Sequence, residues 1–286
     1  MVWNTGAMVE TLAFGYGLLE GPRPDPDGGQ YFSDVTKGGV YRRAPDGTIE
    51  VVVPKRRGVG GILLHADGGI VISGRNLCHV RDGQTRVLFA RDDIPGFNDI
   101  CADAAGRVYT GSMRDNPFST EGERLTGEAY RVDAEGVAVE LYDGVALTNG
   151  IGFSPDGTRL YHADTSERVI KVHDVVDGEV VGGAGGVFAE VDGLPDGLAV
   201  ADDGGVWVAL YGSGCVRRYA PTGEADGEIP VPARGVTSLC FAGPDLRDLI
   251  VVTEDNTEDP ARGGTIFHVP AAEVGARGVP TPLARV

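Results

Sequence analysis

The stretch GQYFSDVTKGGVYRRAPDGTIEVVV, residues 29–53, contains three short apolar runs separated by turn-forming residues. The first run surrounds Phe32, the second surrounds Tyr41 and the third ends at Val53. Short apolar runs bounded by Gly, Asp and Pro are typical of β-strands joined by tight turns. The stretch therefore predicts three successive strands of one β-unit.

The same unit recurs along the chain. Comparable stretches lie at residues 68–89, 106–142, 158–181, 204–229 and 248–270, and the units start near residues 20, 60, 98, 149, 196 and 237. A repeat of about 40–50 residues with four strands per unit is the pattern of a β-propeller. The last unit shows only three clear strands, and the segment Val9–Phe14 can supply the fourth and close the ring. Closure removes exposed sheet edges.

We therefore predict an all-β protein, a six-bladed β-propeller with four-stranded blades in a single domain over residues 1–286. The 45 glycines are scattered rather than periodic, which indicates many tight turns. A helical fold is disfavoured because only residues 271–277 offer a short helical candidate. The glycine-rich stretch 182–186 is expected to connect strands flexibly, since no helix follows it to form a phosphate-binding loop.

The charge balance limits the partners. A formal net charge of −17 argues against nucleic acid and anionic membranes, which both attract basic surfaces. No apolar run is long enough for a transmembrane helix. We expect a small-molecule substrate and neither a nucleic-acid nor a membrane partner; the sequence assigns no oligomeric state.

Cysteine usage points to a reducing compartment. Cys78, Cys101, Cys215 and Cys240 lie far apart in or beside apolar runs, without metal-type spacing. Buried free thiols fit a cytoplasmic protein. Residues 1–7 lack the basic and apolar pattern of a secretory leader, which agrees with this location.

Four polar residues occupy the same relative place in four units: Glu20, Asn98, Asn149 and Asp196. Each lies about ten residues before an apolar-aromatic strand, with a turn between them. In a propeller these side chains would converge at one end of the axis. Any one of them alone reads as an ordinary Asn-Gly or Asp-Gly turn former, and we assign Asp99, Asp202 and Asp203 to that turn class.

Two carboxylates and two amide oxygens form a cage of hard ligands for a divalent cation. Ca²⁺ fits best, followed by Mg²⁺ or Mn²⁺. Zn²⁺ is a further alternative, although it usually binds His or Cys. Two long loops, residues 114–127 and 254–264, are predicted on the same face, where they could select the substrate or simply be surface excursions.

The chain resembles the senescence-marker-protein/gluconolactonase/luciferin-regenerating family of six-bladed, metal-dependent propellers. The similar motifs follow the family order along nearly the whole chain. They are Leu19-Glu-Gly-Pro22, Tyr31-Phe-Ser-Asp34, Asn98-Asp99, Gly106-Arg-Val-Tyr-Thr-Gly-Ser-Met113, Thr148-Asn-Gly-Ile151, Ser154-Pro-Asp-Gly157, Pro195-Asp-Gly-Leu198 and Val236-Thr-Ser-Leu-Cys-Phe241.

The resemblance implies that Glu20, Asn149 and Asp196 hold the metal and that Asn98 binds metal or substrate. It also implies that Asp196 is the catalytic acid or base. Two departures bear on the substrate. Gly96 stands where sugar-lactone members usually carry an Arg, and Arg23-Pro24 stands where a Trp is common. Both favour a lactone or ester other than a simple aldonolactone.

The leading hypothesis is therefore metal-dependent hydrolysis of a lactone or related ester, with Asp196 and Asn98 as catalytic residues. One alternative is a metal-bound propeller that catalyses a non-hydrolytic biosynthetic step, such as isomerisation or cyclisation. Another is a non-catalytic binding propeller, because fold alone does not fix the reaction.

Overall fold

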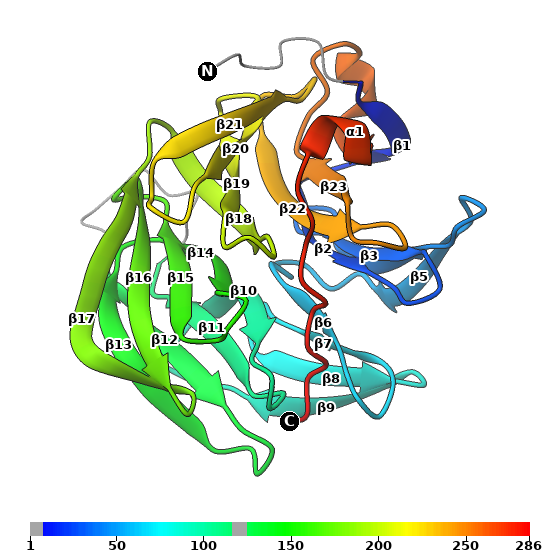
Figure 1. Ribbon diagram of the computed structural model, residues 1–286. Helices are drawn as coiled ribbons and strands as arrows, with labels where there is room; N and C mark the ends of the chain where they lie inside the picture. The colour runs from blue at the N-terminus through cyan, green and yellow to red at the C-terminus, as the bar shows by residue number, and fades with distance from the viewer. Residues whose placement is uncertain (1–7, 116–124) are drawn as a thin grey trace.

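The computed structural model describes residues 8–115 and 125–286 (Figure 1). Residues 1–7, on which the expectation about a leader rests, lie outside these ranges, as do residues 116–124 of the first predicted long loop. No helix in the described part of the chain is long and apolar enough to cross a membrane.

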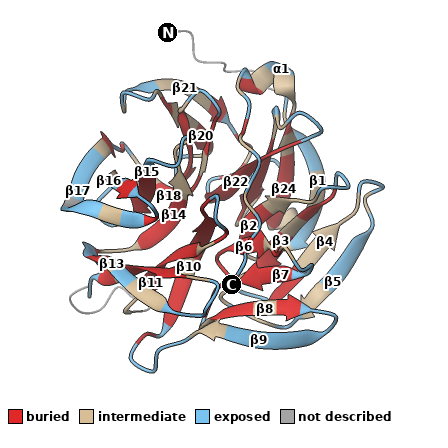
Figure 2. Ribbon diagram, turned by 60° about the horizontal axis from the view of Figure 1, so that its bottom comes forward, coloured by how far each residue is buried: buried red, intermediate tan, exposed pale blue. Residues whose placement is uncertain are grey.

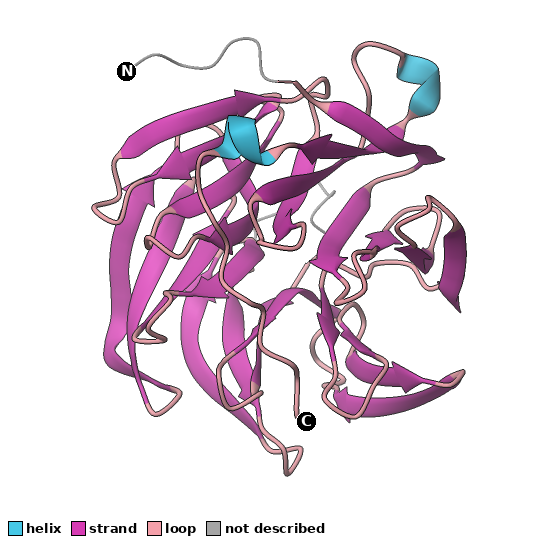
Figure 3. Ribbon diagram, turned by 45° about the vertical axis from the view of Figure 1, so that its right-hand side comes forward, coloured by secondary structure: helices cyan, strands magenta, loops and turns pink. Residues whose placement is uncertain are grey.

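Six four-stranded sheets are arranged around a central axis, and each is one blade (Figures 1 and 3). In blades 1–5 the strands follow chain order from the axis outward. Blade 1 has β2 (Leu19–Pro24), β3 (Gln30–Asp34), β4 (Gly39–Arg43) and β5 (Ile49–Pro54). Blade 2 has β6 (Ile62–Leu64), β7 (Ile70–Ile72), β8 (Leu77–Arg81) and β9 (Gln84–Phe89).

Blades 3, 4 and 5 repeat this plan. Blade 3 has β10 (Gly96–Ala102), β11 (Val108–Met113), β12 (Gly127–Val132) and β13 (Ala138–Val145). Blade 4 has β14 (Thr148–Phe153), β15 (Arg159–Asp164), β16 (Val169–Val176) and β17 (Glu179–Glu190). Blade 5 has β18 (Leu194–Val200), β19 (Val206–Tyr211), β20 (Cys215–Tyr219) and β21 (Ala225–Pro230).

Blade 6 combines both ends of the described chain. From the axis outward its strands are β22 (Val236–Ala242), β23 (Asp248–Thr253) and β24 (Gly264–Val269). β1 (Glu10–Tyr16) pairs with β24 and is the outermost strand. The predicted closure by the N-terminal strand is thus confirmed, as are the six blades. Helical structure is limited in the described residues to the 3₁₀ turn η1 (Pro260–Arg262) and the short helix α1 (Ala271–Val274) (Figure 3).

The prediction for the glycine-rich stretch is wrong in one respect. Residues 182–186 lie within β17 rather than between strands. The register with β16 jumps from Val172↔Gly186 to Asp174↔Val181, so the intervening residues bulge out of the ladder. Gly182, Gly183 and Gly185 all have positive φ angles, which allow this bulge inside one long strand.

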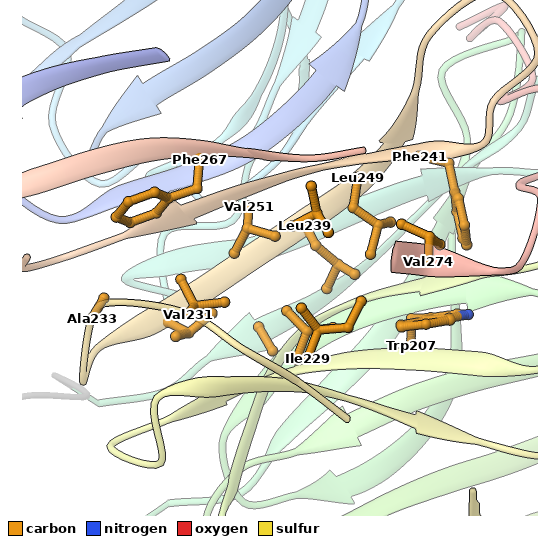
Figure 4. Packing of buried hydrophobic residues seen from close by; sticks show 14 of the residues in the cluster. Trp207, Ile229, Val231, Ala233, Leu239, Phe241, Leu249, Val251, Phe267 and Val274 are labelled. Carbon is orange, nitrogen blue, oxygen red and sulfur yellow. The ribbon is translucent and has the colours of Figure 1, made fainter. Parts of the chain in front are cut away.

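The core consists of apolar clusters between neighbouring blades. Between blades 5 and 6, Trp207 and Phe241 meet edge to face with ring centroids 6.2 Å apart, and Ile229, Val251 and Phe267 belong to the same cluster (Figure 4). The inner strands are mostly buried, whereas the outer strands are exposed along much of their length (Figure 2). Packing between blades thus fixes the inner strands, which carry the candidate site.

The two faces of the propeller differ. The inner strands begin at one face, here called the entrance face. The opposite face carries the first turn of each blade and is crossed by residues 277–286, which run from blade 6 to blade 2 (Figure 1). The crossing segment is held by backbone hydrogen bonds, including Gly278 N to Leu246 O (2.7 Å) and Ala284 N to Leu64 O (2.8 Å).

Candidate functional site

All four predicted site residues lie at the beginning of an inner strand. Glu20 is in β2, Asn98 in β10, Asn149 in β14 and Asp196 in β18. Three of them are buried, and Asn98 is partly buried. Because the inner strands run side by side around the axis, their beginnings lie at the entrance face. The structure therefore brings the predicted residues to one end of the propeller.

A β-bulge accompanies each of these residues. Between Glu20 and Arg23 the inner strand advances three residues while its partner advances only two, from Ser33 to Tyr31. Bulges re-aim side chains and often lie next to active sites. The same irregularity lies between Phe97 and Ile100, between Thr148 and Ile151, and between Pro195 and Leu198.

The residue after the polar side chain lets the inner strands approach one another. It is Gly21, Gly150 or Gly197 in blades 1, 4 and 5. A Cβ on Gly150 would lie 2.3 Å from the backbone nitrogen of Leu198, and a Cβ on Gly197 would lie 2.1 Å from Oγ of Ser238. Contacts this close are not tolerated, so glycine at these positions keeps the ring of site residues narrow.

Blade 3 has Asp99 at the equivalent position, and here the sequence-based assignment to a turn is wrong. Asp99 lies within β10 and is buried, and its Oδ1 accepts a hydrogen bond of 2.8 Å from Ile100 N. Burial raises the pKa of Asp99 to about 6. The signal available in the sequence was a carboxylate where three other units have glycine. Asp202 and Asp203 do lie in a turn, as predicted.

The carboxylates of the site are close enough to oppose each other's ionisation. Burial raises the pKa of Glu20 well above its usual value, and the charges of Asp196 and Asp99 add to the rise. Burial likewise raises the pKa of Asp196, with further contributions from Asp99 and Glu254. Several acidic groups therefore share one poorly solvated site.

Hydrogen bonds fix the two amides. Asn98 Nδ2 donates to Asn149 Oδ1 (3.0 Å) and to the carbonyl oxygen of Thr148 (2.9 Å). Asn149 Nδ2 donates to Thr165 Oγ1 (3.1 Å), which in turn donates to the carbonyl oxygen of Pro195 (2.7 Å). The amide nitrogens thus bind protein atoms. Asn149 Oδ1 accepts the bond from Asn98 and keeps a second lone pair for a ligand.

Sequence reasoning also missed Glu254 and Tyr211. Glu254 is the first residue of the predicted long loop 254–264, and its charge raises the pKa of Asp196. The Tyr211 hydroxyl donates a hydrogen bond to the Glu254 carboxylate. Tyr211 ends β19 in the same blade as Asp196, whereas Glu254 follows β23 in the next blade, so only tertiary structure brings Glu254 to this site.

The donor set fits a hard divalent cation better than a soft one. Within the described ranges, no three His, Cys, Asp or Glu side chains form a metal-binding cluster. The predicted set instead mixes two carboxylates with two amides. Asp196 Oδ1 is buried and has no hydrogen-bond partner among the described residues, which is costly for a carboxylate unless a cation or donor binds it. Glu20, Asn98, Asn149 and Asp196 could therefore hold a metal.

The amino-acid sequence matches a known protein family over most of its length. Residues 18–255 match the model of the SMP-30/gluconolactonase/LRE-like region. The chain belongs to this family. The family members most useful for comparison include a pentonolactonase of Haloferax volcanii, which is 32% identical over 90% of this chain and 92% of its own length. A 6-deoxy-6-sulfogluconolactonase of Pseudomonas putida is 30% identical over 88% of this chain and 89% of its own.

Solved structures show the same fold. A luciferin-regenerating enzyme superposes with a TM-score of 0.86 at 22% identity, covering 98% of this chain and 100% of its own. A calcium-binding protein described as regucalcin, from Agrobacterium tumefaciens, gives a TM-score of 0.84 at 24% identity, covering 98% of both chains.

Proposed function

We propose that this protein is a metal-dependent hydrolase of a lactone or a related ester. The observation that carries the proposal is the meeting of two buried carboxylates and two hydrogen-bonded amides at the bulged beginnings of four inner strands. The family relationship supports it, because relatives that align over most of this chain are named lactonases.

We assign the metal-binding role to Glu20, Asn98, Asn149 and Asp196. Ca²⁺ is the preferred cation for these oxygen ligands, with Mg²⁺, Mn²⁺ and Zn²⁺ as alternatives. A calcium-binding structural relative is consistent with this choice. When bound, a divalent cation polarises the substrate carbonyl and stabilises negative charge on its oxygen.

Asp196 is the proposed catalytic acid or base. No described residue hydrogen-bonds to its Oδ1, so this carboxylate can take a proton from a water molecule that attacks the carbonyl carbon. The free oxygen would equally serve as a nucleophile towards the same carbon. Asn98 orients the substrate, since its amide is held in place by Thr148 and Asn149.

The substrate is proposed to be less polar than an aldonolactone. Gly96 has no side chain to bind substrate hydroxyls, and a Cβ there would lie 3.3 Å from the Met113 methyl group. Met113 is paired with Gly96 across β10 and β11, so the side chain beside Gly96 is apolar. The long loop that starts at Glu254 contributes that residue's carboxylate, whose charge raises the pKa of Asp196.

The cellular location is proposed to be the cytoplasm. Cys78, Cys101, Cys215 and Cys240 are all buried free thiols, which persist in a reducing compartment. The proposed partner is a small-molecule substrate.

The deciding experiment measures hydrolysis by protein stripped of metal, with and without Ca²⁺, Mg²⁺, Mn²⁺ or Zn²⁺. The panel contains alkyl-substituted lactones, aldonolactones and aryl esters, and Asp196→Asn is the matched control. We expect one cation to restore turnover, with alkyl-substituted lactones preferred. Metal binding without turnover of any ester would instead favour an isomerase or cyclase. If neither occurs, the site is a structural ring and the protein a binding propeller.

A further inference from the structure

A separate cavity of about 690 Å³ lies on the opposite face, where blade 1 meets blade 6. Blade 1 contributes the β2–β3 turn and part of β4, and blade 6 contributes residues of β1, β23 and β24. Residues 280–283 of the crossing segment form a further wall. None of the four proposed metal ligands lines this cavity.

Two side chains that line the cavity carry buried hydrogen-bond donors without partners among the described residues. Gln30 is only 4% exposed, and its Nε2 has no hydrogen-bond acceptor; Nε of Arg43 is also buried without one. Gln30 and Arg43 are directly opposed in the β3–β4 ladder, so their side chains lie next to each other on one face of the blade. A buried donor without an acceptor is unfavourable, and rotation of the side chain towards the cavity would let a ligand oxygen satisfy it.

The carboxylates around the cavity already have partners. Asp25 and Asp27 both bind Arg42. Asp248 lies 3.2 Å from His268 Nε2, and it accepts a hydrogen bond of 2.8 Å from the backbone nitrogen of Ala271. The unsatisfied groups of this wall are therefore donors, and the ligand must supply an acceptor.

The remaining walls are largely apolar. They come from both blades and from the crossing segment: Leu12, Pro24, Pro26, Pro45, Leu64, Leu246, Ile250, Pro280, Pro282 and Leu283. A few convergent polar groups in an otherwise apolar concave site are typical of small-molecule binding. The ligand must therefore combine an apolar body with an acceptor at one end.

We propose that this cavity binds an amphipathic monocarboxylate. Its hydrocarbon chain contacts the leucine and proline walls. Its carboxylate accepts hydrogen bonds from the Arg43 guanidinium and from the Gln30 amide. Both side chains line the cavity and reach the ligand by rotation. Guanidinium–carboxylate pairs are stronger than neutral hydrogen bonds, so Arg43 supplies most of the specificity for an acid.

The test uses the full chain and calorimetric titration with octanoate. Octylammonium is the probe of opposite charge and equal chain length. Arg43→Met removes the cation, and Leu283→Asp places a carboxylate at a 41% exposed position of the wall, where folding is not at risk. Arg81→Met is the matched control because it removes an exposed arginine whose ion pair is with the adjacent Asp82.

We expect saturable binding of one octanoate per chain and much weaker binding of octylammonium. Affinity should fall about tenfold or more in Arg43→Met and in Leu283→Asp, and should not change in Arg81→Met. Equal binding of both probes would overturn the proposal. Unchanged affinity in a folded Arg43→Met or Leu283→Asp variant would also overturn it, as would the absence of saturable octanoate binding. The result is independent of hydrolysis and so does not depend on the proposed function.

Discussion

Asn98 of blade 3 donates a hydrogen bond of 3.0 Å to Oδ1 of Asn149 in blade 4, and this bond joins two inner strands at the entrance face. Both residues lie at bulges of their strands. The interaction connects two of the four proposed metal ligands and therefore couples the geometry of one to the other.

This coupling can be measured in metal-free protein with Asn98→Ala, Asn149→Ala and the double variant. We expect the two effects on the free energy of unfolding to be non-additive by about 0.5–1.5 kcal/mol, the usual net value of one hydrogen bond. Urea unfolding gives all three values. Strict additivity would show that the two amides act independently.

Asp196→Asn should separate stability from activity. Neutralising Asp196 removes repulsion from Glu20 and Asp99, so the metal-free variant should gain on the order of 1 kcal/mol at pH 8. Its kcat should nevertheless fall at least about 100-fold, because the proton acceptor is lost. Thermal unfolding and steady-state kinetics test the two parts. A destabilised variant would contradict the repulsion, and a normal kcat would contradict the catalytic role.

Calcium should stabilise the folded protein. Binding to the native state alone contributes about 2.7 kcal/mol when free Ca²⁺ is 100 times its Kd. Glu20→Gln should lose most of this shift, because it removes one of the two proposed carboxylate ligands. Glu50→Gln is the control, since Glu50 is an exposed residue of the outer strand β5. A Glu20→Gln variant that keeps the wild-type shift would exclude Glu20 as a ligand.

Gly150→Ala should be strongly destabilising. The new Cβ would meet the backbone of Leu198, which cannot rotate away, and we expect a loss of about 2 kcal/mol or more. Gly186→Ala is the matched control in the same blade, because the nearest atom to its Cβ is 4.0 Å away. Chemical denaturation should show little change or a slight gain for Gly186→Ala. Equal effects of both substitutions would argue against tight packing around the axis.

The folded protein should lose stability at acidic pH because protonation of His162 favours the unfolded chain. This buried ring interacts with Tyr142 OH (2.8 Å) and Thr148 Oγ1 (2.7 Å), and burial lowers its pKa to about 3. The unfolded chain, with a histidine pKa near 6.5, therefore binds more protons than the folded chain between pH 6.5 and 3. The contribution of His162 is fully present above pH 6.5 and is lost as the pH falls through this range.

His162→Asn removes this titratable ring. The unfolding free energy of the variant should therefore change less with pH than that of the wild type, by up to about 1.4 kcal/mol per pH unit. Burial also lowers the pKa of His173, to about 4, and this residue remains in the variant. Urea midpoints from pH 7 to pH 4 test the difference. Parallel pH profiles for the variant and the wild type would show that His162 does not control acid stability.

The sequence alone determined the number of blades, the closure by β1 and the positions of Glu20, Asn98, Asn149 and Asp196. These features follow from local patterns, since turn residues and alternating apolar runs recur in each unit and need no knowledge of distant contacts. Tertiary structure was needed for Asp99, whose neighbours resemble an ordinary turn in sequence but which lies buried within β10.

Tertiary structure also decided how the site is built. The bulges depend on the register between paired strands, and the requirement for Gly150 and Gly197 arises from the neighbouring blade. Glu254 approaches Asp196 only because the ring places blade 6 beside blade 5. Sequence periodicity specifies which residues begin each strand, whereas side-chain direction and electrostatic contact depend on residues far away in the chain, which only the closed ring brings together.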